Sequence, residues 1–385
     1  MCTWRNSYFE SDEFYALALH LLSIIQVPLN IFGTYIIWYK TPTSMEKVKL
    51  IMLLLHLTCF WFDLFFNILT IPYVVYPASS GYTLGVLSYL GVSTSVLAYM
   101  GFTSIFLLGC VLMTFFEDRY NRLVRRGADT ITRFRKRVIY FSINYSIVFV
   151  CIIPVFLTTP SAEESKLIFR SKFPCLPPTF VEKPGFFMLT TDTTILVASL
   201  SGYLLFSGSQ AGYFLYKTFV YLFKTKALST RTLQMQRQFF KALCIQAAIP
   251  IMAVISPCIY IQVSAGVSYV DMMWSNFAMI LLTTHGIWST LTMLWVHKAY
   301  RQTILSILQH SFSFFPPKMS KKPTTTVKPF VFDNGSIEDN CGENVVSTGF
   351  YFLVMISYSS LAIYPLALCF LCCLPSFIIA FRRNR

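Results

Sequence analysis

Two carboxylates stand directly before an arginine in the run Glu117-Asp118-Arg119-Tyr120, which follows a long apolar stretch. A carboxylate beside a guanidinium can hold it through a charge-assisted hydrogen bond in one state and release it in another. The four residues therefore form a candidate switch in which Arg119 is locked at rest. The competing interpretation makes Arg119 one more positive anchor at a membrane boundary, like Arg122.

Ionisable side chains inside apolar stretches form a second group of candidates, because a charge at the centre of a membrane helix costs about 2.5–3.5 kcal/mol. The spacing of His56, Asp63 and Asn67 places all three on one face of a helix. His285 lies near the middle of a later apolar stretch. We expect these four residues to form a buried polar cluster. It is either a link between the two ends of a bundle or a polar contact that only holds helices together.

The composition of the chain predicts that lipid is its main solvent. Of 385 residues, 55% are hydrophobic, 17% aromatic and only 12% charged, and the mean hydropathy is +0.58, whereas a soluble domain carries roughly 25% charged residues. The net charge of +14 comes from basic runs between apolar blocks, which favours cytoplasmic loops beside anionic lipid over nucleic-acid binding. No zinc-ligand spacing, phosphate-binding loop or hydrolase motif indicates a metal, a cofactor or an enzyme.

Seven apolar blocks are long enough to cross a membrane as helices, which takes about 20 residues each. They are approximately Phe14–Tyr39, Val48–Tyr73, Leu84–Phe116, Val138–Thr159, Phe186–Phe223, Ala242–Val263 and Met272–Val296. Lysine and arginine concentrate in the linkers after the first, third and fifth blocks, and the linkers after the second and sixth have none. The positive-inside rule then places the N-terminus outside and the segment after Val296 inside.

The predicted organisation has four parts: an extracellular N-terminus (1–13), a seven-helix bundle (14–310), a cytoplasmic tail (311–344) and an extra apolar segment (345–385). Residues His297–Gln309 predict a helix along the inner membrane face, and the composition of the tail is typical of disorder. The block Val345–Phe381 is interrupted by two prolines and followed by three arginines. A helical hairpin, an eighth crossing against the positive-inside bias, and sequence foreign to the mature protein stay open as alternatives.

Several short runs spread over the blocks form one pattern: Lys40-Thr41-Pro42, Phe173 to Pro178, Tyr221 to Lys226, Phe239 to Gln246, and His297-Lys298 with Tyr300-Arg301. Together with the Asp-Arg-Tyr motif at Asp118-Arg119-Tyr120, also seen in rhodopsin-like receptors, this pattern resembles the nematode serpentine chemoreceptors of class H over roughly residues 12–308. The resemblance implies a seven-transmembrane chemosensory receptor of the sensory-cell plasma membrane that binds a heterotrimeric G protein through Arg119. Ala299 stands where the family usually has proline, and the Asn-Pro-x-x-Tyr and Cys-Trp-x-Pro motifs are missing, so no further activation switch is carried over.

Cys2 and Cys175 both lie outside in this topology, where the surroundings are oxidising. In many serpentine receptors the loop cysteine pairs with one at the outer end of the third span, but here no cysteine lies between residues 81 and 101. We expect either a Cys2–Cys175 disulfide or two free thiols.

Pro250 and Pro257 in the sixth block predict a kink, which is either a hinge between two states or a static bend. The outer half of the bundle is apolar and aromatic and would suit a small, largely apolar ligand. The candidate pocket residues are Tyr99, Phe102, Phe187, Asp192, Tyr260 and Trp274.

The sequence thus predicts an all-α membrane protein, a seven-transmembrane helix bundle with an extra C-terminal apolar segment. The leading functional hypothesis is a chemoreceptor that reads a small external ligand. The alternative is an eight-span channel or transporter in which the C-terminal block crosses the membrane. Ligand-evoked nucleotide exchange on a G protein would support the first hypothesis, and substrate flux in liposomes the second.

Overall fold

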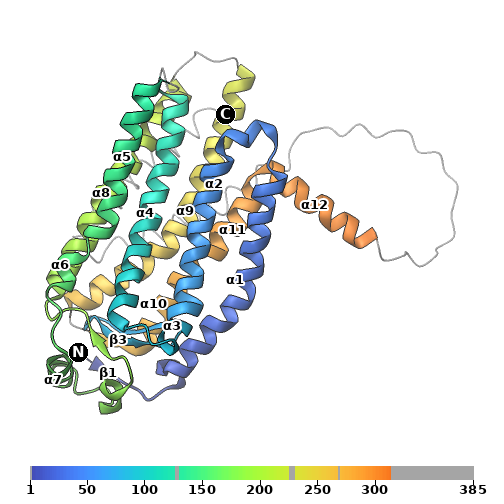
Figure 1. Ribbon diagram of the computed structural model, residues 1–385. Coiled ribbons are helices and arrows are strands. Elements are labelled where there is room, and N and C mark those ends of the chain that lie inside the picture. Colours follow the sequence, from blue (N-terminus) through green and yellow to red (C-terminus); the bar gives the residue numbers. More distant parts are fainter. Residues whose placement is uncertain (1, 126–129, 225–229, 268, 314–385) are drawn as a thin grey trace, which may run out of the picture.

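The computed structural model describes residues 2–125, 130–224, 230–267 and 269–313, most of which lie in long helices running side by side (Figure 1). Predictions for the apolar block 345–381, and for all but the first three residues of the tail, fall outside these described residues.

Seven helical segments correspond to the seven predicted blocks. They are α1 (Asp12–Lys40), α2 (Glu46–Leu64) continued by the π-helical turn η3 (Phe65–Thr70), α4 (Thr94–Leu123), α5 (Ile131–Val150) with α6 (Ile153–Phe156), α8 (Thr193–Lys224), α9 (Thr230–Gly266), and α10 (Met272–Thr283) with α11 (His285–Val296). Within the described residues, six of these segments are apolar enough over their length to cross a membrane by composition alone. The exception is α8, whose 32 residues include several serines and Gln210.

Several helices extend beyond the predicted apolar blocks at their inner ends, as α9 does by starting at Thr230. Two helices instead begin more than a turn later than predicted, and backbone hydrogen bonds explain both. The third helix begins at Thr94 rather than Leu84, because the N–H groups of Leu84 and Gly85 bond to the carbonyls of Ile71 and Thr70. The fifth helix begins at Thr193 rather than Phe186, because Phe187–Met188 form a strand. Apolar composition predicts each of these blocks, but the residues at the outer end of each block form a strand or a turn instead of a helix.

The outer end of the bundle, where the described chain begins, carries short strands that an all-α prediction omits (Figure 1). Strands β2 (Pro72–Val75), β3 (Ser80–Thr83) and β4 (Phe187–Met188) form an antiparallel sheet, and β1 (Cys2–Thr3) pairs in parallel with β5 (Val270–Asp271). The remaining short elements are η1 (Tyr8–Glu10), η2 (Thr43–Met45), α3 (Val86–Tyr89), α7 (Ala162–Lys172) and η4 (Pro178–Glu182).

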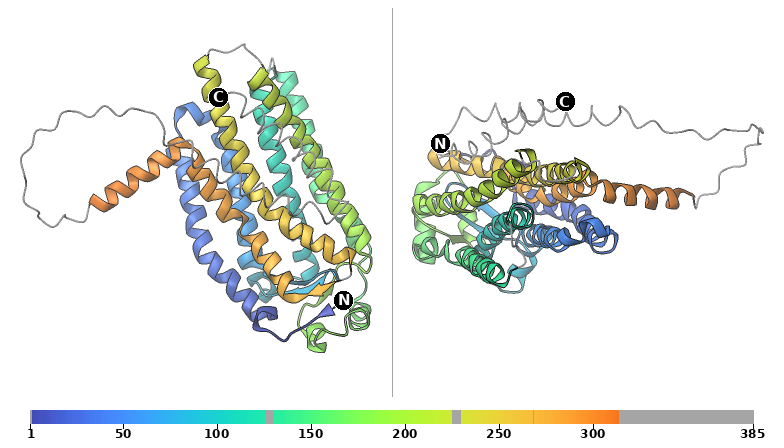
Figure 2. Two further views of the ribbon diagram at one scale, coloured as in Figure 1. Left: turned by 180° about the vertical axis from the view of Figure 1, so that it is seen from behind. Right: turned by 90° about the horizontal axis from the view of Figure 1, so that it is seen from above.

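Helix α4 occupies a central position, packed against α2, α5 and α8, while α11 packs against α9, α1 and α2. Large apolar side chains such as Ile24, Leu157 and Trp295 remain exposed, as expected where lipid rather than water covers the surface. Helix α12 (Lys298–Ser313) leaves the bundle near the end opposite to the N-terminus and points away from it (Figure 2). It matches the helix predicted after the seventh block.

Candidate functional site

The buried polar cluster lies between the first, second and seventh spans. Asn30 of α1 is at its centre: its amide Nδ2 donates to Oδ2 of Asp63 over 2.9 Å, and its Oδ1 accepts from Thr290 of α11 over 2.8 Å. The imidazole Nε2 of His56 lies 2.9 Å from the Asn30 carbonyl. His56 and Asp63 were predicted from the sequence and Asn30 and Thr290 were not, and all four are at most 3% exposed. One side chain of α1 thus joins three spans.

His285 brings the seventh span against Asp63. Its Nδ1 lies 3.6 Å from Oδ1 of Asp63 and 3.1 Å from the Leu282 carbonyl, and the imidazole is fully buried. His285 begins α11 just after the break that separates it from α10. The next residue, Gly286, approaches so closely that a Cβ there would overlap the Asp63 carboxylate. The break and the glycine together let the seventh span touch the second.

Asn67 belongs to a second layer of the same cluster, nearer the outer end. Its side-chain amide donates to Gln26 of α1, whose own Nε2 donates to the Thr283 carbonyl over 2.5 Å. Asn67 lies in η3, and π-helical turns occur frequently at functional sites. The structure therefore places His56, Asp63, Asn67 and His285 in one connected region, as two layers rather than one contact.

Sequence reasoning missed Gln26 and Asn30, which hold the two layers together. The signal was present, because these are two amides four residues apart in an otherwise apolar block and share one helix face. Both are at most 1% exposed. At these two positions the uncharged polar side chains lie in the interior of the bundle, as those of Asp63 and His285 do.

The charged motif at the inner end of α4 differs from the prediction. Glu117 binds Arg137 of α5 over 2.6 Å, and Asp118 binds Arg122, one turn further along, over 2.7 Å. Neither carboxylate forms the expected lock on Arg119. Neighbouring residues of a helix point in directions about 100° apart, so the carboxylates and the arginine between them face different partners.

Arg119 faces the sixth span instead. Its Nη2 donates to Oε1 of Gln236 over 2.9 Å, and the guanidinium lies 4.3 Å from the ring centroid of Phe239. The side chain is 8% exposed. Tyr120 turns toward the fifth span, with its ring 5.4 Å from that of Phe214. Gln236 and Phe239, both on α9, are therefore the partners that the sequence did not single out.

His297 connects this inner contact to the seventh span. Its Nε2 lies 3.0 Å from Oε1 of Gln246 on α9, and its ring packs against Phe239 and Tyr300. Burial, together with the nearby positive charge of Arg119, lowers the pKa of His297 to about 4. The imidazole is thus held neutral at the point where the seventh span ends.

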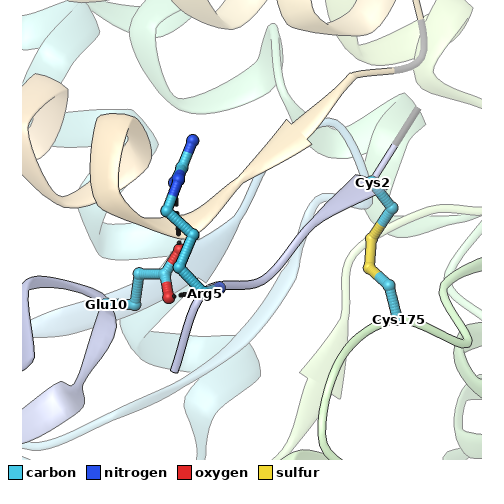
Figure 3. Close-up of a disulfide and its surroundings, with 4 residues drawn as sticks. All are labelled: Cys2, Arg5, Glu10 and Cys175. Atoms are coloured by element: carbon cyan, nitrogen blue, oxygen red, sulfur yellow. Dashed lines mark hydrogen bonds and ion pairs between the residues drawn. A yellow bond between two sulfur atoms is a disulfide. The ribbon is translucent and has the colours of Figure 1, made fainter. Parts of the chain in front are cut away.

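At the outer end, a disulfide joins Cys2 of β1 to Cys175 in the loop before the fifth span (Figure 3). Arg5 lies between two buried carboxylates, bonding to Glu10 over 3.1 Å and to Asp271 over 2.7 Å. Burial alone would raise the pKa of Asp271, but hydrogen bonds from Arg5, Tyr269 and the Trp274 amide hold it below its usual value. Covalent and ionic contacts therefore fix the N-terminal segment across this end.

The model of the serpentine type seven-transmembrane G-protein-coupled chemoreceptor family Srh matches residues 10–310. The chain is also 24% identical over 323 residues to serpentine receptor class H-72 of Caenorhabditis elegans, covering 80% of this chain and 90% of that protein. This protein belongs to the Srh family of serpentine chemoreceptors. The resemblance inferred from the sequence is thereby confirmed, and with it a multi-pass membrane protein of the seven-transmembrane class.

In this Srh receptor none of the six predicted ligand-pocket residues lines either of the two clefts found at the outer end of the described chain, so the pocket stays a prediction. Tyr99 bonds to the Phe149 carbonyl over 2.8 Å, Asp192 caps α8 through Thr194, and Tyr260 bonds to the Asp271 carbonyl. Phe187 is part of β4, Phe102 packs against the core, and Trp274 is 53% exposed. Aromatic composition alone did not distinguish pocket residues from structural ones, because membrane helices carry aromatics on every face.

Two clefts at the outer end do have concave linings. One of about 250 Å³ lies between α1, η3 and α3, and one of about 310 Å³ lies in the loop that carries Cys175. The predicted hinge residues Pro250 and Pro257 both fall within α9, which the structure assigns as one continuous helix. Their role as a hinge stays a prediction.

Proposed function

We propose that this Srh receptor detects a small external chemical and passes the signal to a heterotrimeric G protein on the inner side, with its N-terminus outside the cell. Two features support this orientation. The Cys2–Cys175 disulfide belongs to an oxidising compartment, and the linkers rich in lysine and arginine are at the opposite end.

The contact between Arg119 and Gln236 is the observation that carries the proposal. It ties the third span to the sixth at the end where the basic linkers lie. Phe239 and His297 extend the contact to the seventh span. A shift of α9 away from α4 frees the guanidinium, which then becomes available to a partner protein. The ligand must bind the shifted state more tightly than the resting state for this to happen.

The polar cluster supplies the route between the two ends. Asn67 and Gln26 form its outer layer, and Asp63 and His285 its inner layer. The interpretation of this cluster as helix-to-helix contact alone predicts stability effects only. The signalling interpretation predicts that Asp63→Asn, with normal surface delivery, changes the response.

Nucleotide exchange tests the proposal directly. The receptor is reconstituted in nanodiscs with a panel of heterotrimeric G proteins, and binding of a non-hydrolysable GTP analogue is followed without ligand. Gln236→Ala removes the partner of Arg119 and is expected to raise basal exchange on at least one G protein. Gln238→Ala, an exposed amide on the same helix, is the matched control and leaves exchange unchanged.

An additional Arg119→Gln substitution is expected to abolish the gain of Gln236→Ala. Equal basal exchange in the Gln236→Ala, Gln238→Ala and unsubstituted receptors, all delivered at the same level, contradicts the proposal. Accessibility tags at the N-terminus, at position 323 and after residue 385 test the orientation. A C-terminal tag outside the cell would mean eight crossings and would favour the channel or transporter alternative.

A further inference from the structure

The outer mouth of the bundle is crossed by the N-terminal strap, defined here as residues 2–11. The strap runs from the loop of Cys175 to the start of α1 (Figures 1 and 3). Arg5 ties it to Asp271, and the Asn276 amide donates to the Phe9 carbonyl over 3.0 Å. Strand pairing of β1 with β5 adds backbone hydrogen bonds. A ligand from outside therefore meets a covalently fastened strap at the mouth.

The cleft between α1, η3 and α3, called the flank cleft below, has no residue of the strap in its lining. It has a volume of about 250 Å³. Its lining includes Asp12, Glu13 and His20 of α1, Ile68 of η3, and Val86 and Tyr89 of α3. Tyr89 is 85% exposed, and α1 and α3 lie on the outside of the bundle (Figure 1). The flank cleft therefore opens on the outside of the bundle, near the end that the proposed orientation places at the outer leaflet.

A tight backbone contact joins two of the segments that line the flank cleft. The N–H of Gly85 donates to the Thr70 carbonyl over 2.9 Å, and a Cβ on Gly85 would overlap the Leu69 carbonyl. Only glycine allows this approach, which fixes the start of α3 against the end of the second span. The cleft is thus a defined part of the fold.

The charges at the flank cleft favour a cation. Asp12 already binds Lys183 over 2.8 Å and the Tyr82 hydroxyl over 3.0 Å. Glu13 is exposed and, among the described residues, no ion pair engages it. The lining contains no lysine or arginine. One carboxylate is therefore available to an ammonium group, while Ile68 and Val86 offer apolar surface.

We propose that the flank cleft binds a small amphiphilic amine from the outer leaflet, with its ammonium at Glu13 and its apolar chain along Ile68 and Val86. This rests on the proposed function, because it names the chemical class of the external ligand. A zwitterionic lipid is a poorer occupant, since its phosphate would lie close to Asp12 and Glu13.

The position of Ile68 explains how occupancy reaches the bundle interior. Ile68 and Asn67 are neighbours in η3, and Asn67 bonds to Gln26, which bonds in turn to Thr283 of the seventh span. An occupant that packs against Ile68 displaces the π-helical turn, and the outer layer of the polar cluster follows it.

Direct binding tests the proposal. Purified full-length receptor in phosphatidylcholine nanodiscs is titrated with n-octylamine by calorimetry, with empty nanodiscs as the blank for partitioning. Saturable binding of n-octylamine is expected, with 1-octanol and octanoate binding much more weakly. Glu13→Gln is expected to weaken n-octylamine binding about tenfold, as the loss of one charge-assisted contact implies. Val86→Trp fills the cleft and abolishes binding.

Glu163→Gln removes an exposed carboxylate of α7 on the same side and is the matched control that leaves n-octylamine binding unchanged. Equal affinity for n-octylamine and 1-octanol, an unchanged affinity in Glu13→Gln, or displacement of n-octylamine by phosphatidylethanolamine overturns the proposal.

Nucleotide exchange in the same samples separates this proposal from the one before it. Saturable, Glu13-dependent binding together with equal basal exchange in Gln236→Ala and the unsubstituted receptor leaves the flank cleft standing and contradicts G-protein coupling. Raised exchange in Gln236→Ala without n-octylamine binding contradicts the flank cleft and leaves coupling standing.

Discussion

Arg119 donates a hydrogen bond to Gln236 across the boundary between the third and sixth spans, with 2.9 Å between Nη2 and Oε1. The two carboxylates that precede Arg119 in the sequence are engaged elsewhere, mainly by Arg137 and Arg122. In the described structure the guanidinium of Arg119 is therefore held by a neutral amide rather than by a carboxylate. A guanidinium bonded to a neutral amide lacks the second charge of an ion pair with a carboxylate and is held less strongly, which makes the contact easier to release.

Arg137→Gln tests how much the inner end depends on the carboxylates. Glu117 is 3% exposed and would lose its bidentate partner. Because a buried charge left unpaired is costly, we expect a loss of about 2–3 kcal/mol in the free energy of unfolding. Thermal unfolding of the purified receptor in detergent measures it. The matched control Arg135→Gln, an exposed arginine of the same helix, should leave the melting temperature unchanged. Equal melting temperatures of both variants would contradict the assignment.

The sequence was sufficient to predict the number of spans but not the partners of the charged motif. Hydropathy depends on composition summed over about 20 residues, so the seven blocks are clear even where single residues vary. Whether Glu117 faces Arg119 or Arg137 depends on the rotation of α4 against α5 and α9. That rotation depends on packing between segments far apart in the sequence. The prediction paired Arg119 with Glu117 and Asp118 only because they are close to it in the sequence.

Gly286→Ala tests the close approach of the seventh span to the second. A methyl group at position 286 would overlap the Asp63 carboxylate, so the spans must separate. We expect a loss of about 2 kcal/mol, as overpacking of a core costs, seen as a lower melting temperature and reduced surface delivery. The matched control Gly212→Ala lies in α8 with open space around the new methyl group and should be neutral or slightly stabilising.

A double-mutant cycle makes this test specific. In an Asp63→Ala background the overlapping carboxylate is absent, so Gly286→Ala should cost little there. An equal loss with and without Asp63 would show that the glycine acts through helix propensity or another neighbour.

The Cys2–Cys175 disulfide closes a loop of 173 residues in sequence separation. We expect Cys2→Ser combined with Cys175→Ser to lower the free energy of unfolding by about 2–4 kcal/mol, mainly because the unfolded chain gains freedom. A reducing agent should lower the melting temperature of the receptor but not that of this double variant. Cys244→Ser, which alters a free thiol of α9, is the control. Two free thiols in non-reducing mass mapping would contradict the bond.

The outer end shows why the ligand-pocket residues stay a prediction, while the residues of the polar cluster are brought together by the structure. Ionisable groups within apolar blocks are rare, and their cost confines them to the interior, so Asp63 and His285 could be assigned from type alone. Aromatic residues such as Tyr99 and Trp274 carry no such constraint. The flank cleft depends on the contact of α3 with η3 through Gly85. No pattern in the local sequence predicts this contact.

His297 predicts a distinct dependence of stability on pH. Its pKa is lowered from the ordinary 6.5 to about 4, first by burial and then by the charge of Arg119. Above pH 6.5 the imidazole is neutral in both the folded and the unfolded chain and contributes nothing to the pH dependence. Between about 6.5 and 4 the unfolded chain takes up the proton and the folded chain does not, so stability falls as the pH falls. Below about 4 this loss is complete, on the order of 3 kcal/mol.

His297→Gln isolates that contribution, because glutamine can still donate to Gln246 but cannot take up a proton in this range. Melting temperatures of the receptor and of His297→Gln are compared from pH 7.5 to pH 4. We expect the two curves to converge at the acid end after starting with the unsubstituted receptor more stable, since only its curve contains the histidine titration. Asp271, whose pKa is lowered below 3.8, loses its contribution only at still lower pH and in both proteins alike. Parallel curves over the whole range would show that the pKa of His297 is the same in the folded and the unfolded receptor, and would contradict its burial as a neutral imidazole.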